Sequence, residues 1–224
     1  MERIDRRKLL GMAVLVPLAG LAACATGPGA DTVEEGVRRL LTLSTERAFA
    51  QLLAPNGFYD SQVARIAVPQ AFGGNGSVLG ALLQSGPVRR ELAIAINRVA
   101  QDAADRAAAI VIDRVRRMSL RDAVAVLRGG PTAATDLLQQ AAGGAVLDAM
   151  LPEVSRGLRS DLIQMASAAI AAKTGIDYAE LGQTVAGQAS DGIFRAIGRE
   201  EAAIRANPRA TRDPVLIALL GLTR

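Results

Sequence analysis

The stretch DYAELGQTVAGQASDGIFRAIGREEAAIRANP, residues 177–208, gives the clearest indication of the fold. Asp177 and Glu180 form a capping box, which marks the start of a helix, and Pro208 limits its C-terminal end. Between these points apolar residues recur at helical spacing, as on the buried face of an amphipathic helix: Val185, Ala189, Ile193, Ala196, Ile197 and Ile204. The stretch therefore predicts one long helix with one buried face.

Helical patterns recur along most of the chain, and no stretch alternates apolar and polar residues well enough to support a sheet. Cap signals and apolar spacing predict further helices over about 31–54, 87–118, 119–129, from Thr132 onward, 144–151, 153–173 and from Asp213 onward. The chain is 50% hydrophobic but only 3% aromatic, and such small side chains favour closely packed helices. We therefore expect an all-α protein with a single compact domain of about eight helices.

Two residue types that carry much of enzyme chemistry are scarce here. The 224 residues include no histidine and one cysteine, Cys24. Nucleophiles that depend on an imidazole base, His-ligated zinc and disulfide frameworks are therefore excluded. We expect neither a cofactor nor a metal site.

The charge balance argues against nucleic-acid binding. The chain has 26 Lys and Arg against 22 Asp and Glu, for a net charge of +4. Four of the basic and two of the acidic residues lie in the first 23, so the rest is nearly balanced, with both signs interspersed. Aromatic residues that could stack on bases are nearly absent. We therefore do not expect nucleic acid among the partners.

The amino-terminal segment indicates export. Residues 9–23 are apolar, follow the charged segment MERIDRRK and are too few for a membrane-spanning helix, which needs about 20 residues. This pattern is typical of a secretory signal peptide. The run ends in Leu21, Ala22, Ala23 and Cys24, which resembles the lipobox of bacterial lipoproteins. That resemblance implies cleavage before Cys24 and lipidation of its thiol; the alternative is an ordinary cleaved signal, or an uncleaved anchor, with an incidental cysteine.

These features predict a signal peptide at 1–23, a lipidated tether at 24–30 and a helical domain at 31–224. Arg6 and Arg7 resemble part of a twin-arginine signal, so the choice between that route and general secretion stays open. Ala25 follows the cysteine where an aspartate would resemble an inner-membrane retention signal. We therefore expect a lipid-anchored protein on the outer membrane, facing the periplasm.

Four blocks of the chain resemble a family of exported bacterial proteins that is catalogued only as a domain of unknown function. They are GFYDSQVARIAVP (57–69), INRVAQDAADRAA (96–108), MSLRDAVAVLRGGPTAATD (118–136) and DGIFRAIGREEAAIRANP (191–208). Leu137 and Leu138 stand where an aromatic pair is usual, which weakens any aromatic pocket there. The resemblance implies a helical exported protein, often a lipoprotein, and supplies no activity.

Three polar residues fall on apolar helix faces at 100° per residue. Glu200 lies near the middle of the face within 177–208, with Glu201 at its margin, and Asn97 and Arg114 project among alanines of the helix at 87–118. Such groups need partners when buried. One interpretation is a small polar cleft in which Glu200 acts as acid or base and Arg114 holds an anion. The other is a buried structural ion pair.

Thr132 and Thr135 form a second candidate site in GGPTAATD, at the predicted start of a helix. The exposed N–H groups of a helix start bind anions, so these threonines could hold an anionic ligand. Helix capping after a double-glycine stop is the alternative explanation.

Three function hypotheses follow from the sequence. The first is a non-enzymatic envelope lipoprotein, attached to the membrane through its N-terminal lipid, that binds an envelope protein or a small ligand. The second is a hydrolase or lyase that works through carboxylates such as Glu200, with Arg114 as electrostatic stabiliser. The third is a lipid-handling helical protein with an apolar cavity.

Overall fold

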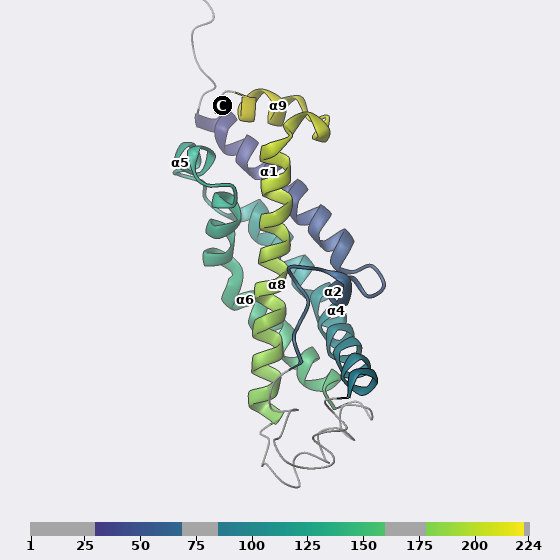
Figure 1. The fold of residues 1–224 in the computed structure, drawn as a ribbon. Helices are drawn as coiled ribbons and strands as arrows, with labels where there is room; N and C mark the ends of the chain where they lie inside the picture. The colour runs from purple at the N-terminus through teal and green to yellow at the C-terminus, as the bar shows by residue number, and fades with distance from the viewer. Residues whose placement is uncertain (1–29, 69–84, 160–177, 222–224) are drawn as a thin grey trace, which may run out of the picture.

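The computed structural model describes residues 30–68, 85–159 and 178–221, and within these ranges the protein is helical with no strand (Figure 1). The all-α prediction is confirmed. The elements in chain order are α1 (Ala30–Leu52), α2 (Gly57–Asp60), α4 (Gly86–Arg117), α5 (Ala123–Arg128), α6 (Ala133–Gly157), α8 (Tyr178–Ala206), the 3-10 turn η2 (Pro208–Thr211) and α9 (Pro214–Gly221).

The four long helices α1, α4, α6 and α8 form the body of the molecule. α6 packs against both α4 and α8, and α1 packs against both α8 and α4. Figure 1 shows α5 and α9 at the end of the molecule where α1 begins. Both short helices contact α1, so this end is closed by chain segments that are distant in sequence.

The core is built from small apolar side chains. The predicted face of α8 is buried as expected: Val185, Ala189, Ile193, Ala196, Ile197 and Ile204. On α4 the buried face is rich in alanine, which lets neighbouring helices approach closely. Gly157 shows how tight this packing is, because a Cβ added there would lie 2.7 Å from the side chain of Val99.

The helix α6 differs from the sequence prediction, which placed breaks near 144 and 152. It runs unbroken through Pro152. Proline inside a helix costs about 3 kcal/mol, but Val146, Met150 and Val154 recur every four residues on one face and are fully buried. Their burial contributes about 1.5–3 kcal/mol each, which outweighs the cost of the proline. The part of the predicted 153–173 helix beyond residue 159 lies outside the described residues.

Among the helices that the structure describes, none combines the length and the apolar character that crossing a bilayer would require.

Candidate functional site

The most deeply buried charged group of the described residues is Glu201, whose exposed fraction is 0%. It lies where α8 passes the start of α6. Its Oε2 accepts hydrogen bonds from the backbone N–H and the hydroxyl of Thr135, both at 2.7 Å, and its Oε1 accepts one from the N–H of Ala134 at 3.1 Å. The carboxylate thus occupies the N-terminus of α6, where unpaired N–H groups favour a negative charge.

Arg205 lies one turn further along α8 and completes this arrangement. Its Nε donates to Oε1 of Glu201 at 2.8 Å. Its terminal nitrogens donate to the carbonyls of Leu127 at 2.9 Å and Val126 at 3.1 Å, in the last turn of α5. One ion pair on α8 therefore caps the start of α6 with its anion and the end of α5 with its cation. We call Glu201, Arg205 and Thr135 the buried clamp.

The clamp changes the interpretation of the predicted anion site. Thr135 does lie against an anion, but that anion is the protein's own carboxylate. Thr132 takes no part: its hydroxyl donates to Asp136 at 3.3 Å, and it makes no side-chain capping bond to α6. The helix-capping explanation is therefore wrong for Thr132, whose hydroxyl is bonded to Asp136. At Thr135 the carboxylate of Glu201 occupies the place that the anion of a ligand would take.

The predicted polar cluster of Asn97, Arg114 and Glu200 is not formed. Arg114 is exposed on α4. Asn97 is buried, but its partners are different ones: its Oδ1 accepts from the N–H of Ile66 at 2.8 Å, in the segment after α2. Its Nδ2 donates to the carbonyl of Ile66 at 3.0 Å and to that of Ala93, one turn earlier on α4, at 2.8 Å. Asn97 thereby fixes an irregular segment that has no ladder of its own to satisfy its backbone groups.

Glu200 is partly exposed, and its carboxylate accepts a hydrogen bond from Gln51 at 2.8 Å. The helical angle placed it correctly on the apolar face of α8, but α1 ends at Leu52, one residue beyond Gln51. At the level of Glu200 the covering helix is therefore finishing, and the middle of the face opens to solvent. The flank of α8 that carries Ser190, Phe194 and Glu201 is instead buried.

Glu200 lies in an open cleft of about 640 Å³ between the end of α1, α2 and α8. Its lining is Gln51, Leu52, Ala54, Pro55, Gly57, Asp60, Ser61, Gln62, Val63, Ala196, Arg199 and Glu200. Asn56 adopts a left-handed φ of 60°, and a Cβ on Gly57 would lie 2.2 Å from the carbonyl oxygen of Gln51. The turn that shapes one wall of the cleft therefore requires the Asn-Gly pair.

Three polar side chains of the cleft are uncommitted within the described part of the chain. Asp60, Gln62 and Arg199 are exposed, and none of them makes a side-chain hydrogen bond or ion pair to a described residue. Arg199 can offer a bidentate donor to a carboxylate or phosphate, and Asp60 and Gln62 can accept hydrogen bonds from hydroxyls or amides. The cleft can therefore take a polar ligand without breaking an internal contact.

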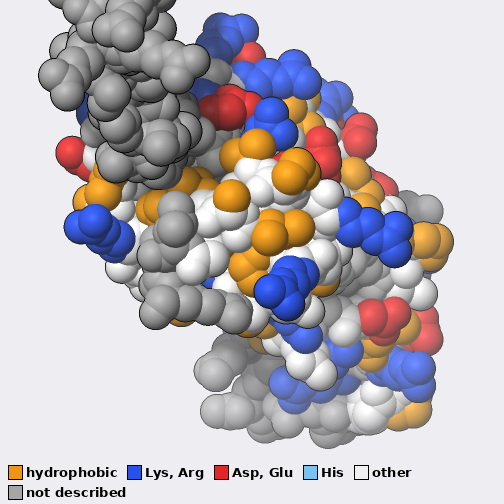
Figure 2. Space-filling view, turned by 90° about the horizontal axis from the view of Figure 1, so that it is seen from above, with side chains coloured by type: hydrophobic (Ala, Val, Ile, Leu, Met, Phe, Trp, Pro, Cys, Tyr) orange, Lys and Arg blue, Asp and Glu red, His pale blue; other side chains and the backbone are white. Residues whose placement is uncertain are grey.

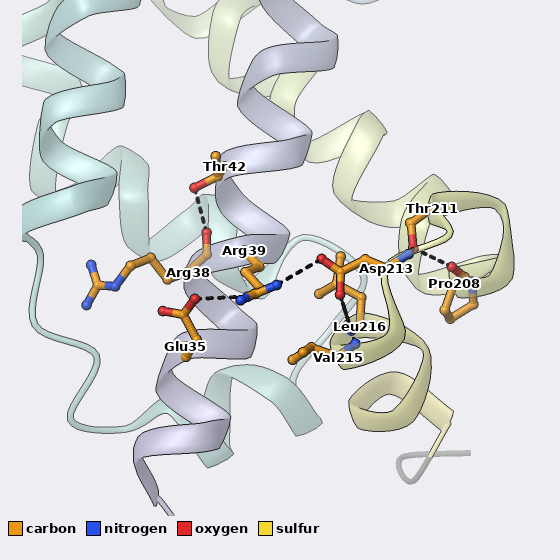
Figure 3. A network of polar contacts seen from close by, with 9 residues as sticks. All are labelled: Glu35, Arg38, Arg39, Thr42, Pro208, Thr211, Asp213, Val215 and Leu216. Atoms are coloured by element: carbon orange, nitrogen blue, oxygen red, sulfur yellow. Dashed lines mark hydrogen bonds and ion pairs between the residues drawn. The ribbon is translucent and has the colours of Figure 1, made fainter.

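A second cleft of about 420 Å³ lies between α1 and the η2–α9 segment. Figure 3 shows the network of polar contacts at this place. Arg39 bridges its two sides: its Nε donates to Glu35 at 2.9 Å and its Nη1 to Asp213 at 3.4 Å. The hydrogen bond to Glu35, followed by that to Asp213, raises the pKa of the Arg39 guanidinium. Asp213 also accepts from the N–H groups of Val215 and Leu216, so it caps α9 as the sequence suggested. These contacts join α9 to α1.

The described residues hold no group of three Asp, Glu or Cys side chains that could bind a metal ion. Cys24 and the lipobox residues Leu21, Ala22 and Ala23 lie outside the described residues.

Comparison with known proteins places the chain in a family. A family model described as Protein of unknown function (DUF4197) matches residues 28–221. No curated protein and no solved structure matches the chain. The matched range includes every described helix from α1 to α9. The chain therefore belongs to the DUF4197 family, whose function is unknown.

Proposed function

We propose that this chain is an exported lipoprotein, attached to the outer membrane through Cys24, whose helical domain binds a polar ligand or partner protein in the cleft beside Glu200. It acts as a binding module and not as an enzyme. The observation that carries the proposal is the contrast within the polar groups of α8: Glu201 is fully engaged inside the protein, whereas Arg199 lies in an open cleft without a partner among the described residues.

The size and lining of the cleft suit binding. Its volume of about 640 Å³ falls in the range of small-molecule sites, which span roughly 300–1,000 Å³. The lining mixes charged and amide groups with small apolar ones, and it contains no aromatic residue. Such a surface favours a ligand with hydrogen-bonding groups and at least one anionic group for Arg199. An acyl chain would not be held well, which argues against the lipid-handling hypothesis.

A carboxylate-based hydrolase or lyase is the second candidate. It is favoured by one observation, that Glu200 and Asp60 line the same cleft. General acid–base catalysis needs a carboxyl group whose surroundings tune its proton affinity, usually by burial or a close like charge. Glu200 is partly exposed and bonded to the amide of Gln51, an arrangement that suits ligand recognition better.

The proposal is tested by photo-crosslinking in intact cells. A photoreactive residue replaces Gln62, which is exposed in the cleft, and in a matched control it replaces Gln140, which is exposed on α6 away from both clefts. We expect a defined adduct from position 62, lost when Arg199→Gln is added, and none from position 140. Equal capture from both positions, or none, would contradict cleft binding. If the wild type captured a chemically converted molecule and Glu200→Gln captured its unconverted form, the result would instead support the enzyme.

The anchor has its own test. Metabolic labelling with a fatty acid should mark the wild-type chain and should leave Cys24→Ser unlabelled. Equal labelling of the two chains would show that Cys24 is not the site of lipidation.

A further inference from the structure

Basic charge is concentrated at the end of the molecule where α1 begins. Residues 113–128, which cover the last turn of α4, α5 and the link between them, contain five arginines and two aspartates. This stretch alone therefore has a net charge of +3, compared with +4 for the whole chain. The remaining sequence is close to neutral, so the charge is local and not a general property of the surface.

Most of these arginines have no acidic partner among the residues that the structure describes. Arg117 pairs with Asp113 at 2.8 Å, but Arg114, Arg116, Arg121 and Arg128 are exposed and form no ion pair with a described residue. The arginines of α1 at the same end differ, because Arg38 and Arg39 pair with Glu34 and Glu35 respectively. The unbalanced positive charge therefore belongs to the end of α4 and to α5.

An apolar side chain stands among these arginines. Val124 is 45% exposed and is the one large hydrophobic residue so exposed within the described ranges. Arg128 follows it by four residues on α5, a spacing that places the two side chains on one helix face, and Arg121 lies in the turn just before α5. Seen from this end, apolar side chains lie beside basic ones over the middle of the face, with acidic side chains mostly toward its edges (Figure 2). We call Arg114, Arg116, Arg121, Val124 and Arg128 the basic surface.

The basic surface is close to the start of α1. The guanidinium of Arg38 donates to the carbonyls of Val115 at 2.7 Å and Arg116 at 2.9 Å, so the end of α4 lies against α1 at this level. Eight residues of helix separate Ala30 from Arg38, which corresponds to about 12 Å. Cys24 is six residues before Ala30, so a lipid on Cys24 can be at most about 20 Å from the start of α1.

We infer that the basic surface rests on the anionic phospholipid headgroups of the leaflet that holds the lipid on Cys24. The inference depends on the proposed lipid anchor and adds the orientation of the domain. The arginines pair with headgroup phosphates, and Val124 reaches the boundary between headgroups and acyl chains. Because the cleft lies at the other end of α1, about 30 Å along the helix, this orientation holds the cleft open to the periplasm.

The experiment uses the full lipidated chain, purified from membranes and reconstituted into vesicles. With Cys24 acylated, Val124→Cys supplies the only free thiol for a polarity-sensitive fluorophore. Arg90→Cys, exposed at the far end of α4, is the matched control. In vesicles of phosphatidylcholine mixed with phosphatidylglycerol, we expect the probe at position 124 to report an apolar environment that high salt abolishes. We expect no such signal at position 90, or in vesicles of phosphatidylcholine alone.

Two charge variants show whether the arginines are responsible. Replacing Arg116, Arg121 and Arg128 by Gln should lower the ratio of membrane-contacting to free-standing orientations by roughly fivefold per arginine. The control replaces Arg89, Arg90 and Arg98 by Gln, which removes the same charge from the other end, and should leave the signal at position 124 unchanged.

The possible failures are distinguishable. If the protein floats with the vesicles but the probe at position 124 reports water, the orientation is wrong and the anchor stands. If both triple variants lower the signal equally, only net charge matters and the basic surface is not a docking face. If Cys24 reacts as a free thiol and the protein does not float, the anchor is absent and the orientation falls with it. Crosslinking of position 124 to an acidic protein in place of lipid would also overturn the inference.

Discussion

Glu200 and Glu201 are neighbours in sequence and lie in opposite environments. Glu201 has no exposed surface and accepts four hydrogen bonds, three from the start of α6 and one from Arg205. Glu200 faces an open cleft and accepts one hydrogen bond, from the exposed amide of Gln51. The first carboxylate joins α8 to α6 and pairs with Arg205, which binds α5, and the second is available for contact with other molecules.

The difference comes from the helices that surround α8. The flank with Glu201 faces the start of α6, whose N–H groups replace the water that a buried carboxylate loses. The middle of the apolar face, where Glu200 lies, faces the end of α1, and none of the described helices continues past Leu52 to cover it. A residue's position on its own helix thus fixes the direction in which it points, whereas its burial depends on where the neighbouring helices stop.

The largest effect is expected for Glu201→Gln. The change leaves the guanidinium of Arg205 without its charge partner and turns an amide N–H toward the donors of α6, so the free energy of unfolding should fall by about 3–5 kcal/mol. Urea denaturation measures this. Glu200→Gln is the matched control and should lose less than about 1 kcal/mol, because its hydrogen bond is exposed. If Glu200→Gln lost more stability than Glu201→Gln, the expectation from helical angles alone, that Glu200 is the buried carboxylate, would be right.

Asn97→Leu tests whether the segment around Ile66, which follows the cleft residues 61–63, depends on a buried side-chain contact. The substitution leaves the N–H and the carbonyl of Ile66 without their partner, and we expect a loss of about 2–4 kcal/mol in the free energy of unfolding. Gln101→Leu, on the same helix, is the control, since it removes one longer hydrogen bond of 3.3 Å to Leu53. Equal losses would show that the segment around Ile66 does not need Asn97.

The two threonines at the start of α6 should differ in how much their hydroxyls contribute to the free energy of unfolding. Thr135→Val removes a buried hydroxyl donor to the Glu201 carboxylate and should cost about 1.5–3 kcal/mol, as for hydrogen bonds to charged groups. Thr132→Val should cost less than about 0.5 kcal/mol, because its hydroxyl contacts only the exposed Asp136. Thermal or urea unfolding of the pair checks the difference. Similar values would mean that the carboxylate does not rely on Thr135.

Arg199→Gln should have the smallest effect on stability. Its side chain has no partner among the described residues, so the free energy of unfolding should change by less than about 0.5 kcal/mol. The crosslinked adduct from position 62 should nevertheless be lost. A variant that is strongly destabilised would place Arg199 with the structural residues and would remove the main argument for a binding cleft.

Helices were predictable where the sequence itself marks their start or end. Asp213 and Pro214 marked the start of α9, and the capping residue does accept N–H bonds from Val215 and Leu216. The continuity of α6 through Pro152 was missed, because the local cost of proline is visible in the sequence whereas the burial that offsets it is not. Capping by Thr132 failed for a similar reason: the start of α6 is satisfied by Glu201, which is more than sixty residues away in sequence.

The sequence by itself determined the all-α class, the apolar face of α8 and the family, because helical periodicity and residue type are local properties. It also identified Asn97 as a polar group that needs a partner when buried, and Thr135 as part of a candidate anion site or helix cap. Only the tertiary structure decided what those partners are. Asn97 binds the backbone of Ile66, and Thr135 binds the carboxylate of Glu201 in place of a ligand. The pairing of polar groups depends on which helix ends meet in space, and the spacing of residues along one helix carries no information about the others.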